Sequence, residues 1–348
     1  MSQNSAKYWD KHSARLMYSR MESAEEISAE IAEIYRTAYN QISHDISTLY
    51  KQFRTDFSLS EKEAMQLLNT LQDPTDLKAL YKALTNKGTP EALRLKAALN
   101  APEYQRDIAR LQALQQKIND ISRDIYKQDL SAQRKWYTGL CHDTYYRTIY
   151  DVQRQVGFQF SFAHIDDKLI RRIISTKWDG SGYSTRLWHN INGVSKEVQK
   201  QLTLGLISGK TEKQMADEIA NKYAQGAFES RRLVRTESCY LSNEIQMTAY
   251  EECEAERYQY VATLDSKTDE ECGELDRKTF LVKNRRPGIN CPPMHPFCRC
   301  TTKIYLGQNT RADLRRRARD PKTGKNIIVP AHISYKQWAK DNGITPKK

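Results

Sequence analysis

Two long series of apolar residues, spaced three and four apart, constrain the fold of this chain more than any other feature. The first series consists of Ile27, Ile31, Ile34, Ala38, Ile42, Ile46 and Leu49. The second consists of Ile108, Leu111, Leu114, Ile118, Ile121 and Ile125. Such spacing places all members of a series on one side of an α-helix. Each stretch is therefore predicted to be a long amphipathic helix that buries one face.

The two helices are predicted to pack on each other as an antiparallel hairpin within one chain. Short helices that begin near Ser60 and Thr75, at sequences resembling capping boxes, lie between them and supply a turnaround. The same spacing also fits an intermolecular coiled coil, which stays open as the alternative. The aromatic-rich stretch 130–162 is predicted to continue as helix. The fold class is mainly α, with a helical hairpin or bundle over residues 1–163.

Composition supports a soluble, folded and largely helical protein. Of its 348 residues, 39% are hydrophobic and 28% are charged, and the regular spacing of the apolar residues argues against disorder. The first ten residues lack the layout of a signal peptide, and no apolar run approaches the ~18 residues of a membrane span. We expect a protein that works in a cytoplasm without a membrane partner.

Residues 164–305 are predicted to form a small α+β domain. Short helical segments lead to a helix that opens near Leu233 and ends near Glu254. After it, the stretches 258–264 and 278–282 are rich in Tyr, Val, Thr and Phe, and they are predicted to pair as a β-hairpin. Arg235 and Glu237 lie at the predicted start of that helix, where we expect structural ion pairing with other buried polar groups.

Four cysteines and a histidine gather around this hairpin, at Cys272, Cys291, His295, Cys298 and Cys300. In a reducing compartment, clustered cysteines bind metal more often than they form disulfides. Structural zinc prefers four tetrahedral Cys or His ligands, and ligands close in sequence bind one ion only on tight loops. The preferred prediction is a structural zinc site made by Cys272, His295, Cys298 and Cys300.

The fourth ligand of this site stays open, because Asp269 or Cys291 could replace Cys300. Cys298 and Cys300 can reach one ion only if the backbone turns sharply between them. The remaining cysteines, Cys141, Cys239 and Cys253, are predicted to be small buried hydrophobic residues. Neither an HExxH motif nor another helix-borne ligand pair occurs, and the other histidines are scattered. We therefore expect no enzymatic activity.

The C-terminal segment, residues 306–348, is predicted to be a basic tail. From Lys303 to Lys348 the chain has twelve Lys and Arg against three Asp, which gives +9 of the total net charge of +12. Such a segment can contact phosphates, although solvated tails have similar compositions. The candidate phosphate-contacting residues are Arg311, Arg315, Arg316, Arg317 and Arg319.

Several motifs follow one another in a fixed order over this part of the chain. They are Arg235-Thr-Glu237, the stretch 264–268, Cys272-x-x-Leu275-Asp276-x-Lys278-x-Phe280 and Pro292-Pro-x-His295-Pro-x-Cys298-Arg-Cys300. Their combination, over roughly residues 165–305, resembles the phage Mu F-like head morphogenesis family. Family members often have a cysteine or small polar residue in place of Asp269 and lack Cys291. These departures are a further reason why the fourth ligand stays open.

The resemblance implies a minor capsid protein of a tailed bacteriophage or prophage. Such a protein associates with the portal protein and other head proteins, and it is carried inside the procapsid and virion after assembly in the bacterial host cytoplasm. In part of the family it also contacts double-stranded DNA during packaging or ejection. The residues by themselves leave two alternatives, a zinc-containing DNA-binding protein and a metal-dependent nuclease or toxin domain.

Overall fold

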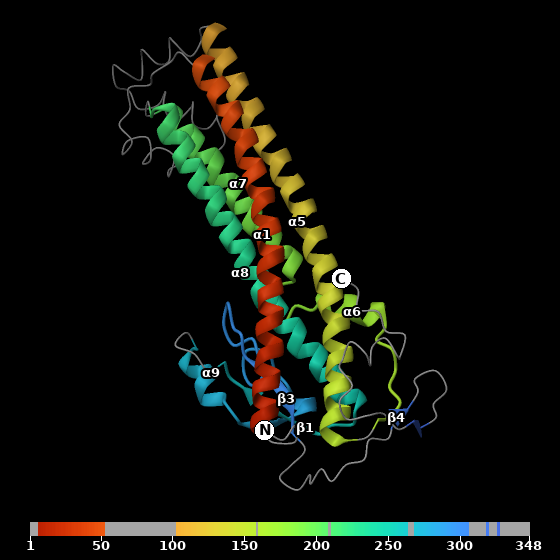
Figure 1. Cartoon of the computed structure of the whole chain (residues 1–348). Coiled ribbons are helices and arrows are strands. Elements are labelled where there is room, and N and C mark those ends of the chain that lie inside the picture. The colour runs from red at the N-terminus through yellow and green to blue at the C-terminus, as the bar shows by residue number, and fades with distance from the viewer. Residues whose placement is uncertain are drawn as a thin grey trace. The chain divides into compact units, whose positions relative to one another are not determined.

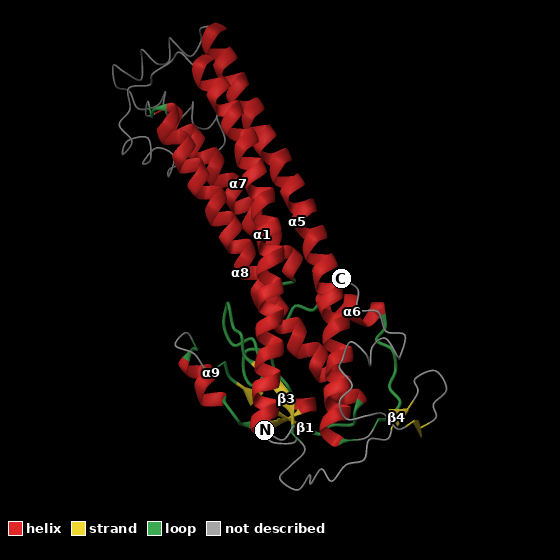
Figure 2. Ribbon diagram, in the orientation of Figure 1, coloured by secondary structure: helices red, strands yellow, loops and turns green. Residues whose placement is uncertain are grey.

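A computed structural model describes residues 6–52, 102–157, 159–207, 210–263 and 268–305, with two short strands at 318–319 and 326–327. Helices predominate in these residues, and the strands are short (Figure 2). The long helices are α1 (Ala6–Gln52), α5 (Pro102–Val156), α7 (Tyr183–Ile207) and α8 (Glu212–Glu252), and the short ones are α6 (Asp167–Ile174) and α9 (Glu270–Leu275). The predicted mainly α fold is confirmed.

The chain divides into two compact units, each made of pieces that are distant in sequence. The sheet unit comprises Met1–Ser28, Ala132–Tyr183 and Arg231–Lys348, and the helical unit comprises Ala29–Ser131 and Ser184–Ser230. Helices α1, α5 and α8 each contribute residues to both units. These units cut across the predicted segments 1–163, 164–305 and 306–348.

The helical unit is a bundle of segments from α1, α5, α7 and α8, which lie side by side in Figure 1. The middle of the apolar series of α1 lies in its core, where Ile31, Ala38, Ile42 and Ile46 are buried, as are Leu111, Leu114, Ile118, Ile121 and Ile125 of α5. The Asp45 carboxylate pairs with Lys117 Nζ at 2.6 Å. The Tyr35 hydroxyl lies 3.5 Å from Asp129 Oδ2. The later residue of α1 thus contacts the earlier residue of α5, and the earlier residue of α1 contacts the later residue of α5. The predicted antiparallel hairpin is therefore confirmed.

The sheet unit contains a three-stranded antiparallel sheet in the order β2-β1-β3. The strands are β1 (Arg257–Val261), β2 (Thr279–Leu281) and β3 (Thr301–Ile304). Tyr258 of β1 lies opposite Phe280 of β2 and Ile304 of β3. The predicted pairing of 258–264 with 278–282 is therefore observed in shortened form. Strand β3 was not predicted, and it directly follows the cysteines at 298 and 300.

Two predicted helix boundaries are wrong. Helix α8 does not open near Leu233, because it runs unbroken from Glu212 with buried residues Met215, Ile219, Tyr223, Gly226 and Ser230 at spacings of three and four. The helix predicted over 130–162 ends at Val156, and Gly157 follows it with a φ of 78°. Glycine adopts this left-handed conformation at low cost, which suits the end of a helix. The short helices predicted near Ser60 and Thr75 lie outside the described residues.

Candidate metal centre

Three cysteines from two segments of the sheet unit meet in its core. Cys272 lies on α9, and Cys298 and Cys300 lie in the segment that leads into β3. Their sulfur atoms all lie within 4.8 Å of one another, and the sulfurs of Cys272 and Cys298 are 3.9 Å apart. All three residues are at most 2% exposed. Of the predicted ligands, these three are brought together.

Local turns place the three thiols at this point. The Asp269 carboxylate caps α9 by accepting a hydrogen bond from the backbone N–H of Glu271, and Cys272 is the buried residue of this short helix. Before β3, the chain turns sharply at Phe297, whose φ is 62°. The Cys298 N–H donates to the His295 carbonyl at 3.1 Å and closes the turn. This turn carries the chain into the position from which Cys298 and Cys300 both reach the cluster.

One face of α8 holds the cysteine-bearing segment by hydrogen bonds. The Thr236 hydroxyl accepts the Phe297 N–H at 3.2 Å, and Asn243 Nδ2 donates to the Cys300 carbonyl at 3.3 Å. The Gln246 side-chain oxygen accepts from the hydroxyls of Thr301 and Thr302 at 3.2 and 3.3 Å. These α8 residues, together with Cys239, lie three or four positions apart and so share one side of the helix. We call residues 236, 239, 243 and 246 the α8 seam.

The three thiols differ in how readily they lose a proton. Hydrogen bonds from Cys272 and Cys298 lower the pKa of Cys300, assisted by the Thr263 backbone N–H and by Tyr260. A hydrogen bond with Cys298 raises the pKa of Cys272, and one with Cys239 raises the pKa of Cys298. The three thiols therefore share hydrogen bonds that favour one thiolate among them. A thiolate is the form of cysteine that binds metal.

The arrangement fits a tetrahedral zinc ion. A Zn–S bond of about 2.3 Å and tetrahedral angles imply sulfur atoms about 3.8 Å apart. The observed separation of 3.9 Å between Cys272 and Cys298 agrees with this value, and it is far longer than the ~2.0 Å of a disulfide bond. The Tyr260 hydroxyl donates to Cys272 Sγ at 3.4 Å, as outer-shell groups do around metal-bound thiolates.

The other predicted ligands lie apart from this cluster. His295 is partly exposed, and its Nδ1 lies 2.8 Å from the carbonyl oxygen of the next residue. Asp269 is exposed at the start of α9. Cys291 is buried in a second apolar cluster with Val152, Met247, Tyr250, Tyr258, Val282 and Ile304. The structure therefore brings together three cysteines without these three candidates.

Arg235 and Glu237 lie in the middle of α8 and have separate partners in the sheet unit. Arg235 pairs with Glu25 of α1. Glu237 is buried, and its carboxylate accepts hydrogen bonds from Trp178 Nε1 at 3.1 and 3.2 Å. Of the candidate phosphate-contacting residues, Arg319 belongs to strand β4 (Ala318–Arg319), which pairs with β5 (Asn326–Ile327). Arg311, Arg315, Arg316 and Arg317 lie outside the described residues.

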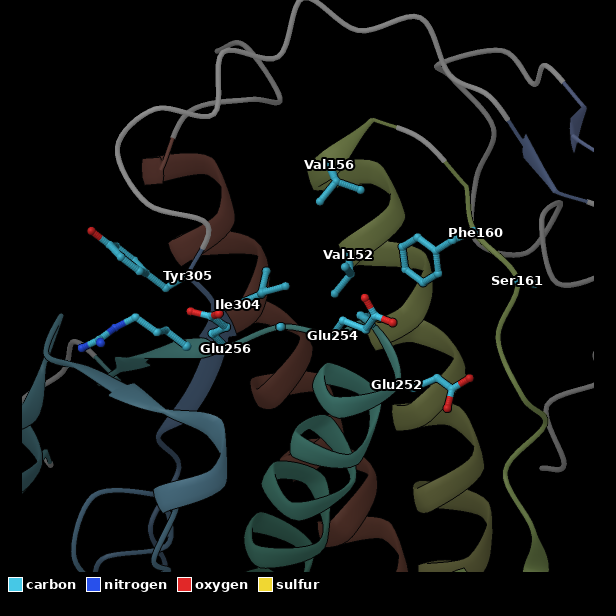
Figure 3. Close-up of a pocket in the computed structure, with 12 residues that line it drawn as sticks. Val152, Val156, Phe160, Ser161, Glu252, Glu254, Glu256, Ile304 and Tyr305 are labelled. Carbon is cyan, nitrogen blue, oxygen red and sulfur yellow. The ribbon is translucent and has the colours of Figure 1, made fainter.

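The sheet unit also contains a cavity of about 640 Å³ between the end of α5 and the strands. Figure 3 shows Val152, Val156 and Phe160 on one side of it, and Ile304 and Tyr305 on the other. Glu252, Glu254 and Glu256 also line it. Ser161, Cys253, Ala255 and Arg257 complete its lining.

Comparison with known families places the cysteine cluster within a matched segment. Residues 196–303 match the family described as Phage Mu protein F like protein. No curated protein and no solved structure matches the chain. Among the residues that the structure describes, no helix has both the length and the apolar character needed to cross a membrane. The match includes all of α8, the strands β1 and β2 and all three clustered cysteines. Over residues 196–303, the chain therefore carries a domain of the phage Mu protein F like family.

Proposed function

We propose that this protein is a minor head protein of a tailed bacteriophage or prophage, acting in head morphogenesis. The observation that carries the proposal is the family match over residues 196–303. In this proposal the protein binds the portal protein and other head proteins in the host cytoplasm during assembly. It is then enclosed in the procapsid and stays in the virion interior.

Association with procapsids tests this role. The chain should be produced together with the portal and major capsid proteins of the same phage or prophage, and the particles separated on a gradient. We expect the chain to sediment with procapsids and to return to the top of the gradient when the portal gene is deleted. A chain that stays at the top of the gradient in both preparations contradicts the proposal.

We further propose that the cysteine cluster binds zinc in a structural role. A hydrolytic zinc keeps one ligand position open to water and needs a general base nearby. Here Cys272, Cys298 and Cys300 are buried among Met17, Met21, Tyr260 and Ala262. This enclosure supports a closed site that fastens α9 and the turn at Phe297 to the sheet. The zinc would stabilise the folded domain and take no part in a reaction.

Contact with DNA is a second proposed role, and the charge of the tail supports it. The five arginines between residues 311 and 319 can each neutralise a phosphate and release counterions. The variant with Arg311, Arg315, Arg316, Arg317 and Arg319 changed to Gln should bind double-stranded DNA more weakly. The slope of log affinity against log salt should fall by about 0.9 for each phosphate that the variant no longer neutralises.

A matched change elsewhere in the chain controls for total charge. Arg36, Arg110, Arg123, Lys127 and Lys213 are exposed residues of the helical unit, and their change to Gln removes the same number of positive charges as the tail variant. Fluorescence anisotropy with a labelled duplex at several salt concentrations provides the measurement. Equal affinities and equal salt slopes for the wild type and the tail variant contradict DNA binding by the tail.

A further inference from the structure

We propose that Cys239 of helix α8 is the fourth ligand of a closed zinc site that it forms with Cys272, Cys298 and Cys300. This inference rests on the proposed zinc site. It names a ligand that the spacing of the cysteines in the sequence did not suggest. Cys239 lies 33 positions before Cys272 in the sequence and stands alone in a helix. Its place in the site comes from the packing of α8 against the segment that carries the other cysteines.

Burial and contacts place Cys239 beside the other three cysteines. It is fully buried and belongs to the same core cluster as Cys272, Cys298 and Cys300. Its thiol donates to the Cys300 carbonyl at 3.5 Å. Its sulfur is not one of the three that all lie within 4.8 Å of one another. A thiol that keeps its proton is expected to turn toward such a carbonyl acceptor.

Zinc binding would cause the Cys239 side chain to rotate toward the other three sulfur atoms. When zinc binds, each thiol that becomes a ligand loses its proton to solvent, because the thiolate is the metal-binding form. Without that proton, Cys239 can no longer donate to the Cys300 carbonyl. That carbonyl keeps a donor, since Asn243 Nδ2 lies 3.3 Å from it. The sulfur is then free to move to the fourth corner of the tetrahedron, and the Cys300 carbonyl stays hydrogen-bonded.

The surroundings of the four sulfurs are those of metal-bound thiolates. Asn243 Nδ2 lies 3.7 Å from Cys239 Sγ, and the Tyr260 hydroxyl donates to Cys272 Sγ at 3.4 Å. Four thiolates and one Zn²⁺ leave a net charge of about −2, and the guanidinium of Arg235 lies near enough to Cys239 to act on its charge. Donors and a cation therefore already surround the site.

The other candidates fit the fourth position less well. His295 is partly exposed and has its Nδ1 engaged by the neighbouring carbonyl. Asp269 caps α9 and is exposed, and Cys291 belongs to the other apolar cluster. Cys239 is the candidate that shares the core of the three cysteines. In consequence, the zinc would join α8 to α9 and to the start of β3. It would also hold the α8 seam in place against the segment that carries Cys298 and Cys300.

Metal analysis of purified full-length protein tests the assignment. The chain and its Cys239→Ala, His295→Ala and Cys291→Ala variants are prepared under reducing conditions, and zinc per chain is measured. Cobalt is then exchanged for zinc, since the strength of the thiolate-to-cobalt absorption reports the number of thiolate ligands. We expect one zinc and four thiolates in the wild type. We expect the Cys239→Ala variant to lose more affinity than the ~10–100-fold that an outer-shell change costs, and to show three thiolates.

Control variants separate ligation from folding. Cys141→Ala removes another fully buried thiol from a long helix of the same unit, and it should retain one zinc and four thiolates, as should His295→Ala and Cys291→Ala. If Cys239→Ala fails to fold, the cobalt spectrum of the wild type still counts the thiolates. A wild-type spectrum of three thiolates, or full affinity in Cys239→Ala, refutes the role of Cys239 alone. A wild type that binds no zinc refutes the zinc site itself. The proposed role in head morphogenesis is tested separately, by association with procapsids.

Discussion

Tyr258 and Tyr260 lie two positions apart on β1, and both are fully buried, but their hydroxyls have different partners. The Tyr260 hydroxyl donates to Cys272 Sγ at 3.4 Å. The Tyr258 hydroxyl donates to the carbonyl of Asn290 at 3.1 Å, in the loop before the clustered cysteines. The pair therefore allows a metal-related hydroxyl to be compared with a structural one on the same strand.

The Tyr260→Phe variant should bind zinc about 10–100-fold more weakly, because it removes an outer-shell donor from a metal-bound thiolate. The Tyr258→Phe variant removes an equally buried hydroxyl and should leave zinc affinity unchanged. Competition with a chromophoric chelator measures both affinities. Equal zinc affinities for the two variants contradict a role of Tyr260 in supporting the metal.

At the same scale, the sequence located only part of the candidate site. Cys272, Cys298 and Cys300 could be proposed as ligands because they lie within a short, cysteine-rich stretch. Cys239 was predicted to be an ordinary buried residue, because nothing in its helix distinguishes it. The available signal was the spacing of Thr236, Cys239, Asn243 and Gln246, which places four hydrogen-bonding side chains on one side of a helix.

At the scale of elements, close packing of helices in the helical unit depends on Gly226 of α8. A Cβ atom at this position would lie 2.8 Å from Val194 Cγ2 of α7 and 2.9 Å from the Tyr35 ring of α1. Tyr35 is fully buried, and its hydroxyl lies 3.5 Å from Asp129, which also accepts from Ser230 at 2.8 Å. The ring therefore has little freedom to move away, and the helices can approach only because Gly226 has no side chain.

Overpacking usually costs about 1–3 kcal/mol, and alanine favours a helix over glycine by ~1 kcal/mol. Gly226→Ala is expected to destabilise the protein by the difference between these two free energies. Gly193→Ala on α7 is the matched change, because a Cβ there meets nothing within 4 Å. It should stabilise the protein by roughly 0.5–1 kcal/mol. Urea denaturation followed by circular dichroism gives both values. A Gly226→Ala variant as stable as Gly193→Ala contradicts this view of the packing.

At the scale of the whole molecule, stability should depend on alkaline pH through buried tyrosines and thiols. Burial raises the pKa of Tyr35, Tyr223 and Tyr250, and that of the Cys141 thiol. In the unfolded chain a cysteine ionises near pH 8.5 and a tyrosine near pH 10. The unfolded state therefore releases these protons first. The contribution of the thiol to stability is fully present below about pH 8.5 and that of the tyrosines below about pH 10, and each is lost as pH rises further.

We expect the urea midpoint to fall between pH 9 and pH 11. Tyr250→Phe removes one buried ionisable group and should reduce this fall, whereas Tyr18→Phe removes a tyrosine that is 62% exposed and should leave it unchanged. The midpoints of the three proteins at pH 7, 9 and 11 provide the comparison. If the urea midpoint falls by the same amount in the wild type and in Tyr250→Phe, groups other than Tyr250 cause the loss of stability at alkaline pH.

The sequence by itself determined the mainly α fold, the antiparallel pairing of α1 with α5 and the first two strands. The helices and strands follow from the spacing of apolar and β-branched or aromatic residues along a single element, and the antiparallel pairing follows from the turnaround expected between the two long helices. Only the tertiary structure decided that the three longest helices contribute to two units, and that α8 brings Cys239 beside three distant cysteines. These features depend on contacts between residues far apart in the chain. Helical periodicity indicates which face of α8 is buried, but it does not indicate which segment of the chain covers that face.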